Sequence, residues 1–211
     1  MAKSHDIRID RSKLHPWLNY KLTLLLNKCA KKGIYLIITE GFRTTEYQDQ
    51  LYAKGRTAPG SIVTNARGNS YSSQHQWGIA FDIAINDSKK LYDVATIKKV
   101  AKIAKSKSVG LCWGGDWTSP VDMPHFYLGK WGATTSKLKS LYSSFSRFKR
   151  TWTMTVTGAG EKGIRIFDKT KIKALKRVKN GKKLNVLYVS GKWAKVEFNG
   201  TVGFVKSKFL K

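Results

Sequence analysis

The stretch "SSQHQWGIAFDIAI", residues 72–85, passes from a polar start into an apolar run typical of a strand. One carboxylate, Asp82, interrupts that run, and one of the four histidines, His75, lies seven residues before it. An ionised carboxylate among apolar neighbours is costly unless it is paired, hydrogen-bonded or bound to a metal. We therefore expect Asp82 to have a partner. The alternative is a strand-end aspartate that points to solvent on the opposite face.

A second polar cluster, "GGDWTSPVDMPHFYLG" at residues 114–129, supplies candidate partners. Asp122 and His125 lie three residues apart in it, flanked by two prolines that favour a rigid turn. Two histidines and one carboxylate from separate segments make a three-ligand set of the kind that binds zinc, with water in the fourth position. A second carboxylate nearby could take the proton from that water.

Around these clusters the hydrophobic pattern predicts helices alternating with strands. The expected helices cover 14–32, 44–55 and 93–110, and the expected strands cover 34–39, 80–85, "LCWGGDW" and "HFYL". Thr45 and Gln48 form a possible capping pair for the second helix. Residues 56–72 are rich in Gly, Ser and Asn and predict a long loop, which in a compact domain is often functional.

The composition changes after residue 130. Residues 132–150 are rich in Ser, Thr and Lys, as in a linker, and short β-like runs separated by glycine turns follow from about residue 151. Residues 150–211 hold 16 Lys and Arg against 3 Asp and Glu, a net charge of +13, whereas the longer segment 1–149 carries +14. We therefore expect a domain at 1–131, a linker at 132–150 and a small all-β barrel at 151–211.

The net charge of +27 on 211 residues predicts binding to a polyanion, such as nucleic acid, an anionic membrane or an anionic wall polymer. Charge alone does not choose among these three. Cys29 and Cys112 are too few for a disulfide scaffold, so we expect reduced core residues, with a single bridge as the alternative. The sequence shows no signal peptide, and its longest apolar stretch, "LTLLLNKC", is too short to span a bilayer.

The two clusters carry a resemblance to a known family. "SSQHQWGIAFD" fits the pattern S-x-H-x-x-G-x-A-x-D as Ser73, His75, Gly78, Ala80 and Asp82, and "DMPH" fits D/E-x-x-H. Together with "GFRTTEYQDQLYAKGRT" upstream, they resemble the M15 family of zinc peptidases, in particular its L-alanyl-D-glutamate peptidase branch of phage endolysins and bacterial autolysins. The resemblance covers roughly residues 5–130. It implies an α+β domain with a small antiparallel sheet and flanking helices.

The resemblance also implies a metal site. Zn²⁺ would be bound by His75, Asp82 and His125, and Asp122 would act as general base and acid. Asp116 is expected as a turn carboxylate, with an outer role around the metal as the alternative.

Three further residues are assigned through the resemblance. Arg43 would stabilise the developing oxyanion or polarise the scissile carbonyl; a surface salt bridge is the alternative. Gln48 and Ser73 would help to hold substrate, against simple roles in helix capping and in a turn. The remaining histidines, His5 and His15, lack a partner pattern and are expected to be structural.

The end of the chain resembles a bacterial SH3-type domain of the wall-binding kind. The resemblance rests on "G-x-W-x-K-V" at Gly191–Val196 and on "NGTVGFVKSKFL" at Asn199–Leu210. It implies attachment to the cell wall, partly through anionic wall polymers. A generic barrel with a solvated basic face is one alternative, and a surface for nucleic acid is another, because aromatics with Lys suit it too.

The sequence thus predicts a zinc metallopeptidase that cleaves the L-alanyl-D-glutamate bond of the peptidoglycan stem peptide and lyses bacteria, as an endolysin does. The enzymatic alternative is a D-alanyl-D-alanine carboxypeptidase. The non-enzymatic alternatives are a basic wall-binding protein and a nucleic-acid-binding protein, but no recognised nucleic-acid motif is present. We expect a monomer without a membrane span, made in the cytoplasm and acting at the wall after release, through a holin if it is phage-encoded.

Overall fold

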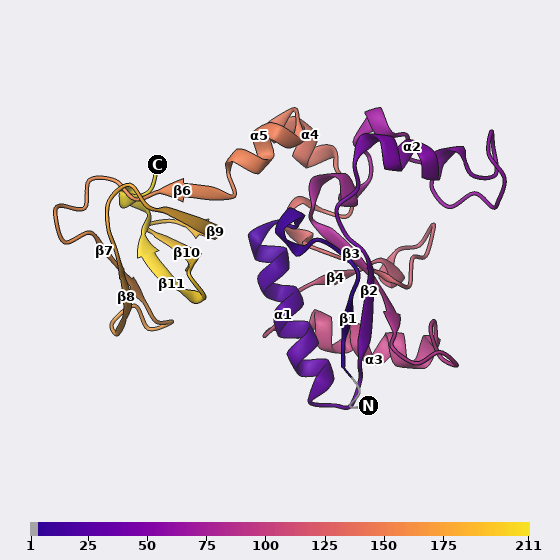
Figure 1. Ribbon diagram of the computed structural model, residues 1–211, viewed down its shortest axis with the longest axis horizontal. Helices are drawn as coiled ribbons and strands as arrows, with labels where there is room; N and C mark the ends of the chain where they lie inside the picture. Colours follow the sequence, from indigo (N-terminus) through magenta and orange to yellow (C-terminus); the bar gives the residue numbers. More distant parts are fainter. Residues whose placement is uncertain (1–3) are drawn as a thin grey trace. The chain divides into compact units, whose positions relative to one another are not determined.

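The computed structural model describes residues 4–211, and the chain divides into two compact units with the boundary after Phe145. Figure 1 shows helices packed around a sheet in the first unit, called unit 1 here, and a second unit, unit 2, built mainly of curled strands. The helices of unit 1 are α1 (Pro16–Ala30), α2 (Thr45–Ala53), α3 (Val94–Lys105) and α4 (Ser136–Tyr142). Its strands are β1 (Asp6–Ile7), β2 (Leu36–Glu40), β3 (Ala80–Ile85), β4 (Cys112–Trp113) and β5 (His125–Tyr127).

The sheet of unit 1 has the strand order β1-β2-β3-β5-β4. Strands β2, β3, β5 and β4 pair antiparallel, which confirms the predicted small antiparallel sheet with flanking helices. The pattern did not predict β1, which pairs parallel to β2. The parallel direction follows from α1, which carries the chain back between the two strands, as a parallel connection requires.

Helices α1 and α3 pack against each other and supply much of the core. The apolar side of α1 is fully buried at Leu18, Leu22 and Leu25. Pro16 begins this helix, and the Nδ1 atom of His15 accepts a hydrogen bond of 3.1 Å from the Trp17 backbone. Such an N-cap satisfies one of the unpaired amides of the first turn. His15 is therefore structural, as predicted.

The start of α2 differs from the prediction by one residue. Thr44 is the N-cap, and its hydroxyl accepts from the Tyr47 backbone at 3.2 Å, so the capping pair assigned to Thr45 and Gln48 is wrong. Thr44 and Thr45 are adjacent and both can cap a helix, so the sequence alone does not distinguish them. Gln48 faces inward instead and is fully buried.

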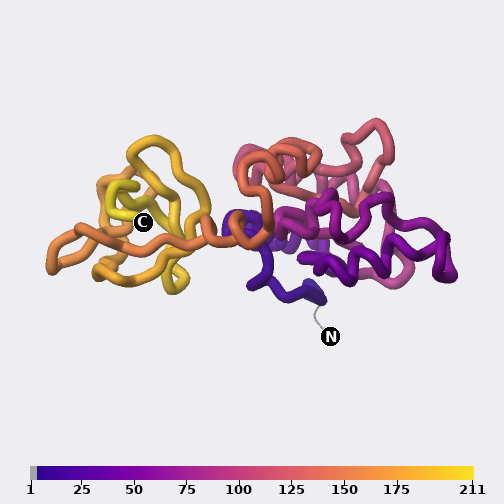
Figure 2. The backbone as a smooth tube through the Cα atoms, turned by 90° about the horizontal axis from the view of Figure 1, so that it is seen from above, coloured from indigo at the N-terminus to yellow at the C-terminus, as the bar shows by residue number. Residues whose placement is uncertain are grey.

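Unit 2 contains six antiparallel strands in the order β6-β9-β10-β11-β7-β8. They are β6 (Thr153–Thr155), β7 (Ile164–Phe167), β8 (Ala174–Val178), β9 (Lys183–Ser190), β10 (Trp193–Phe198) and β11 (Thr201–Lys206). The backbone curls round until Lys211 exchanges backbone hydrogen bonds with Thr155, and Figure 2 shows the C-terminus among these strands. The predicted SH3-like barrel is confirmed. Strand β8 was not predicted, because "ALKRV" is an exposed basic edge strand without a clear apolar alternation.

The segment 132–150, expected as a linker, contains two short helices, α4 and α5 (Phe145–Arg150). The boundary between the units falls inside this segment. Both cysteines are free thiols, Cys29 buried and Cys112 partly buried. Within residues 4–211, none of the helices combines the length and apolar content that crossing a bilayer requires.

Candidate metal centre

The backbone of unit 1 brings the two polar clusters together. A 3-10 turn over Gln74–Trp77 presents His75 and ends at Gly78, whose φ of 63° lies in the left-handed region that favours glycine. The chain then enters β3, where Asp82 is the direct antiparallel partner of His125 on β5. Side chains of directly opposed residues share one face of a sheet. Strand pairing therefore places Asp82 beside His125, and the turn adds His75.

Three donor atoms converge at this point. The Asp82 Oδ1 atom lies 3.2 Å from His75 Nε2 and 3.0 Å from His125 Nδ1, and the two nitrogens are 3.2 Å apart. Both histidines are buried, and the Asp82 side chain is 16% exposed. Ligand atoms bound to a tetrahedral zinc at about 2.0–2.1 Å would lie roughly 3.3 Å from one another. The spacing of the three atoms fits such an ion.

The outer hydrogen bonds fix which ring nitrogen of each histidine carries the proton. The Nδ1 atom of His75 lies 2.7 Å from the Gly41 carbonyl oxygen, which can only accept, so Nδ1 donates and Nε2 keeps its lone pair. The His125 Nε2 atom lies 2.8 Å from Gln74 Oε1.

The orientation of the Gln74 amide follows from its other end. Its Nε2 group donates to the carbonyls of Gly132 and Ala133, at 3.3 and 3.2 Å, so Oε1 must face His125. His125 therefore carries its proton on Nε2, and the lone pair of its Nδ1 atom points toward Asp82 and His75. Two nitrogen lone pairs and a carboxylate oxygen then face one another with no proton between them. Three acceptors at this spacing repel one another unless a cation lies among them, as in a metal site.

Arg43 holds the other side of the carboxylate. Its Nη2 atom lies 3.4 Å from Asp82 Oδ2, and its Nε atom lies 3.3 Å from Glu40 Oε2. The Arg43 side chain is 15% exposed, so these ion pairs are largely buried and do not lie on the surface. Burial by itself would raise the pKa of Asp82, but when His75 or His125 takes up a proton on the nitrogen that faces the carboxylate, its charge and hydrogen bond outweigh burial and hold that pKa below its usual range. Asp82 is thus an anion oriented from both sides.

Asp122 lies beside the donor set without joining it. Its backbone amide donates to the Gly114 carbonyl at 3.1 Å, and its own carbonyl accepts from the His125 amide at 3.3 Å. A Cβ atom on Gly114 would come within 2.6 Å of the Asp122 carbonyl oxygen, so this approach requires glycine. Burial and the negative charge of Asp82 raise the pKa of Asp122 above its usual value. A carboxyl group with a raised pKa exchanges protons more readily near neutral pH.

The other predicted residues lie at different distances from the centre. Gln48 extends from α2 toward Arg43, with 3.5 Å between Oε1 and Nη1, and its amide donates to Thr64 and Ala66. It therefore fixes the 56–72 loop to the site. Ser73 is partly buried and immediately precedes the turn that carries His75. Asp116 is an exposed turn residue paired with Lys105 at 2.8 Å, as the turn interpretation predicted.

Sequence reasoning missed three neighbours of the site: Gln74, Glu40 and Trp117. The Trp117 ring lies 5.1 Å from the His125 ring and its Nε1 group donates to the Tyr127 hydroxyl at 3.1 Å. Only Glu40 left a signal in the sequence, because it immediately follows the strand predicted at 34–39 and precedes Arg43 by three residues. Gln74 acts through contacts with residues more than fifty positions further along the chain, and Trp117 contacts His125 and Tyr127 across a turn.

Comparison with known proteins shows which families and proteins this chain is similar to. The family described as D-alanyl-D-alanine carboxypeptidase, of the M15 peptidases, matches residues 66–128, and the bacterial SH3 domain matches residues 165–211. The peptidoglycan L-alanyl-D-glutamate endopeptidase CwlK of Bacillus subtilis (strain 168) is 40% identical over 125 residues, which cover 54% of this chain and 72% of that protein. The L-alanyl-D-glutamate peptidase of Listeria phage A118 is 32% identical over 103 residues, covering 48% of this chain and 33% of that protein. The crystal structure of the Serratia marcescens L-Ala D-Glu endopeptidase ChiX has a TM-score of 0.42 and 20% identity, covering 56% of this chain and 82% of that chain.

The range 66–128 contains His75, Asp82, Asp122 and His125, so the similarity includes the three donors and the neighbouring carboxyl group, while Arg43 and Gln48 lie outside it. The first unit is a peptidase. More specifically, the chain belongs to the M15 family of peptidases, and a bacterial SH3 domain follows its peptidase unit.

Proposed function

We propose that this protein is a zinc-dependent endopeptidase that cleaves the L-alanyl-D-glutamate bond of the peptidoglycan stem peptide. One observation carries the metal-dependent chemistry: the donors of His75, Asp82 and His125 converge with both histidine protons already engaged elsewhere. The substrate follows from two relatives that are named for this bond and share 40% and 32% identity with the chain.

The proposed centre assigns zinc to His75 Nε2, Asp82 Oδ1 and His125 Nδ1. When bound there, zinc lowers the pKa of a water molecule and polarises a carbonyl group. The protein's part is to hold the three donors in place. The Gly41 carbonyl orients His75, Gln74 orients His125, and Arg43 orients Asp82.

Asp122 is proposed as the group that moves protons. Its carboxylate would accept a proton from the attacking water and donate it to the amine nitrogen released from the cleaved bond. The raised pKa supports this role, because a group must gain and lose a proton near the working pH to serve in both steps. The close approach of Gly114 fixes the backbone of the turn that carries Asp122.

Substrate contacts are proposed for three residues. The Arg43 guanidinium would stabilise negative charge on the scissile carbonyl oxygen. Gln48 and Ser73 would position the peptide, since Gln48 joins Arg43 to the 56–72 loop and Ser73 precedes the turn of His75. The loop would then form one wall of the peptide-binding site.

Unit 2 is proposed to hold the enzyme on the wall. Trp193 and Phe167 pack edge to face with ring centroids 6.0 Å apart, and both are partly exposed. The Lys171 ammonium lies 5.2 Å from the Trp193 ring centroid and 5.5 Å from that of Phe204. Aromatic rings with flanking cations suit an anionic polymer that also presents apolar surface.

We further propose domain bounds of 1–131 and 151–211 and a monomeric state. The protein would act at the wall after release from the cytoplasm, with lysis of the bacterium as the outcome.

The test is digestion of purified peptidoglycan with zinc-loaded protein, followed by mass spectrometry of the new termini. New N-terminal D-glutamate is the expected result, and loss of both zinc and cleavage is expected for His75→Ala. Release of free D-alanine instead would assign D-alanyl-D-alanine carboxypeptidase activity, the description carried by the matching family. A His75→Ala protein that retains a full equivalent of tightly bound zinc would contradict the ligand assignment.

A further inference from the structure

A second candidate binding site lies at the other end of the unit 1 sheet. An open groove of about 830 Å³ runs between the C-terminal end of α1 and the helix α3. Its cationic lining consists of Lys28, Lys31, Lys32, Lys99 and Lys102. The remaining lining comes from hydroxyl side chains and two isoleucines, one of which is Ile34, and no acidic or aromatic residue contributes.

The five lysines of this groove form no close ion pair with the protein, although Lys99 interacts at longer range with the Asp93 carboxylate at the start of α3. Among the residues that the structure describes, none of the five lies within 4.0 Å of a carboxylate oxygen. Lys31, Lys32, Lys99 and Lys102 are exposed, and Lys28 is partly buried. Like charges that share a groove repel one another, so an anion in the groove would stabilise the unit.

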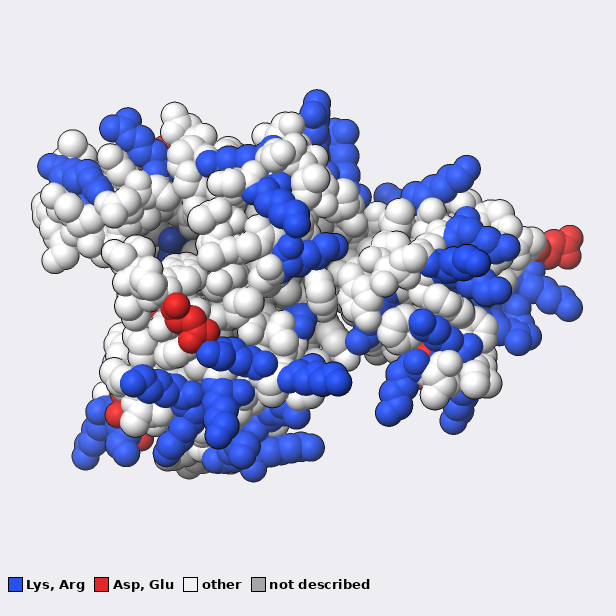
Figure 3. Space-filling model, turned by 180° about the vertical axis from the view of Figure 1, so that it is seen from behind, with Lys and Arg blue, Asp and Glu red and all other residues white. Residues whose placement is uncertain are grey.

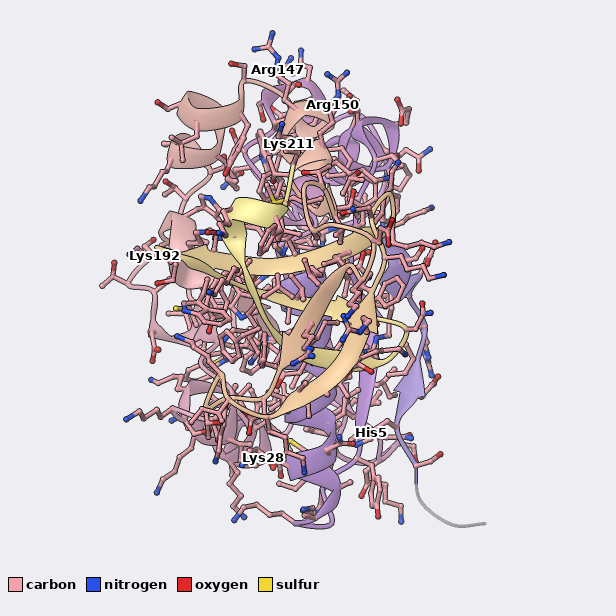
Figure 4. The ribbon with its side chains drawn as sticks, turned by 90° about the vertical axis from the view of Figure 1, so that its left-hand side faces the viewer. His5, Lys28, Arg147, Arg150, Lys192 and Lys211 are labelled. Atoms are coloured by element: carbon pink, nitrogen blue, oxygen red, sulfur yellow. The ribbon has the colours of Figure 1, made fainter. Side chains whose placement is uncertain are left out.

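The groove is remote from the metal centre. Ile34 lines it at the start of the extended segment that becomes β2, whereas Glu40 and Arg43 beside the centre lie at the end of that segment. Six residues of extended chain from Ile34 to Glu40 span roughly 20 Å. Figure 4 shows Lys28 at the lower end of the unit, near His5, and Figure 3 shows Lys and Arg gathered over that end.

We propose that this groove binds a polyol-phosphate polymer of the bacterial wall, such as a teichoic acid. Repeated phosphodiesters match a row of ammonium groups, and the polyol matches the serine and threonine hydroxyls at the groove. The absence of aromatic and arginine side chains from the lining disfavours single-stranded nucleic acid, which is bound by stacking bases on such groups. The choice of a wall polymer rests on the proposed function, whereas the anion-binding groove does not. Polymer contact on the peptidase unit itself would keep this unit at the wall independently of unit 2.

The experiment measures binding of the full chain to fluorescent poly(glycerol phosphate) between 50 and 200 mM salt. The groove variant combines Lys31→Gln, Lys99→Gln and Lys102→Gln. A matched control removes the same charge from exposed lysines of unit 1 outside the groove, through Lys54→Gln, Lys89→Gln and Lys137→Gln.

Each phosphate contact contributes about 0.7 to the slope of log affinity against log salt for a flexible single chain. Loss of three contacts should make the slope shallower by about 2. Over this salt range, the affinity of the unmodified protein should fall about 20-fold more than that of the groove variant. The control variant should retain a slope close to that of the unmodified protein.

Equal effects of the two variants would overturn the proposal, because binding would then follow net charge alone. A groove variant that keeps polymer binding but loses binding to duplex DNA would assign the groove to nucleic acid instead. Hydrolysis of a soluble stem peptide is measured in parallel and should be unchanged in the groove variant. Absence of that hydrolysis in the unmodified protein would contradict the proposed peptidase function, while the polymer measurement would still decide the role of the groove.

Discussion

Replacement of Gln74 by methionine removes the acceptor that fixes the proton of His125, together with the two hydrogen bonds that the Gln74 amide donates to Gly132 and Ala133. Methionine has a similar length and fills the same buried space, but it accepts no comparable hydrogen bond. The bond removed is 2.8 Å long and joins two side chains that are each at most 5% exposed. In the variant, the His125 proton would move to Nδ1 and donate to Asp82 Oδ1, which is 3.0 Å away.

The magnitude follows from the burial of that bond. An unsatisfied buried donor costs about 1–3 kcal/mol. Converted at 1.4 kcal/mol per factor of ten, this corresponds to about 5- to 150-fold, and replacement of an outer partner of a metal-binding histidine typically weakens metal affinity about 10- to 100-fold. We therefore expect zinc affinity to fall within the latter range.

Two measurements test this expectation in the full-length protein. Zinc affinity is measured by competition with a chromophoric chelator at pH 7.5, and the protonated ring nitrogen of His125 is identified by ¹⁵N NMR in the metal-free protein. Gln74→Glu serves as the matched variant, because it restores an acceptor for His125 Nε2–H and should recover part of the affinity. The reasoning would be refuted if metal-free Gln74→Met kept its proton on Nε2 and bound zinc within threefold of the unmodified protein.

Four further outcomes are expected. Asp122→Asn should lower peptide cleavage about 10²–10⁴-fold while zinc content, measured by metal analysis, stays at one equivalent; near-normal turnover would place the base elsewhere. Burial lowers the pKa of His15 to about 3, so the folded protein loses stability as pH falls from about 6.5 toward 3, by about 2 kcal/mol at pH 5. The free energy of unfolding, measured with urea at pH 7 and at pH 5, should differ less between the two pH values in His15→Asn than in the unmodified protein. An equal difference in both proteins would show that His15 is not the group responsible. Gln48→Ala should cost about 1–3 kcal/mol by leaving the Ala66 carbonyl unpaired, and limited proteolysis should then cut within 56–72; an uncut loop would argue against this link. In a pull-down with purified walls, binding should weaken as salt rises but keep a salt-resistant part, and Trp193→Ala should remove that part. Salt-resistant binding that survives the substitution would have to come from residues other than Trp193 and its neighbouring rings.

The sequence was sufficient to locate the donors because their signal is local and chemical. His75 and Asp82 lie seven residues apart on a turn and the strand that follows it, and Asp122 precedes His125 by three residues. An acid inside an apolar run requires a partner, and the structure places that partner directly opposite it. Their roles toward zinc remain predictions.

Contacts between distant segments account for what the sequence could not predict. Gln74 takes its orientation from Gly132 and Ala133, which lie 58 and 59 residues further along the chain. Strand β1 has two residues and pairs with β2 only after α1 has turned the chain back. In unit 2, β8 is held by its pairing with β7, since its own residues lack the apolar alternation of a buried strand.

The direct pairing of Asp82 with His125 has a consequence for insertions and deletions in this family. A long segment of the chain that includes α3 connects these two residues. Their relative position is nevertheless fixed by the hydrogen-bonded ladder (the strand pairing) between β3 and β5. Length changes within this segment leave that ladder intact. A single residue gained or lost inside either strand would turn one donor to the opposite face of the sheet. Homologues should therefore vary in length between β3 and β4, a segment that includes α3 but none of the groups of the centre, and not within β3 or β5.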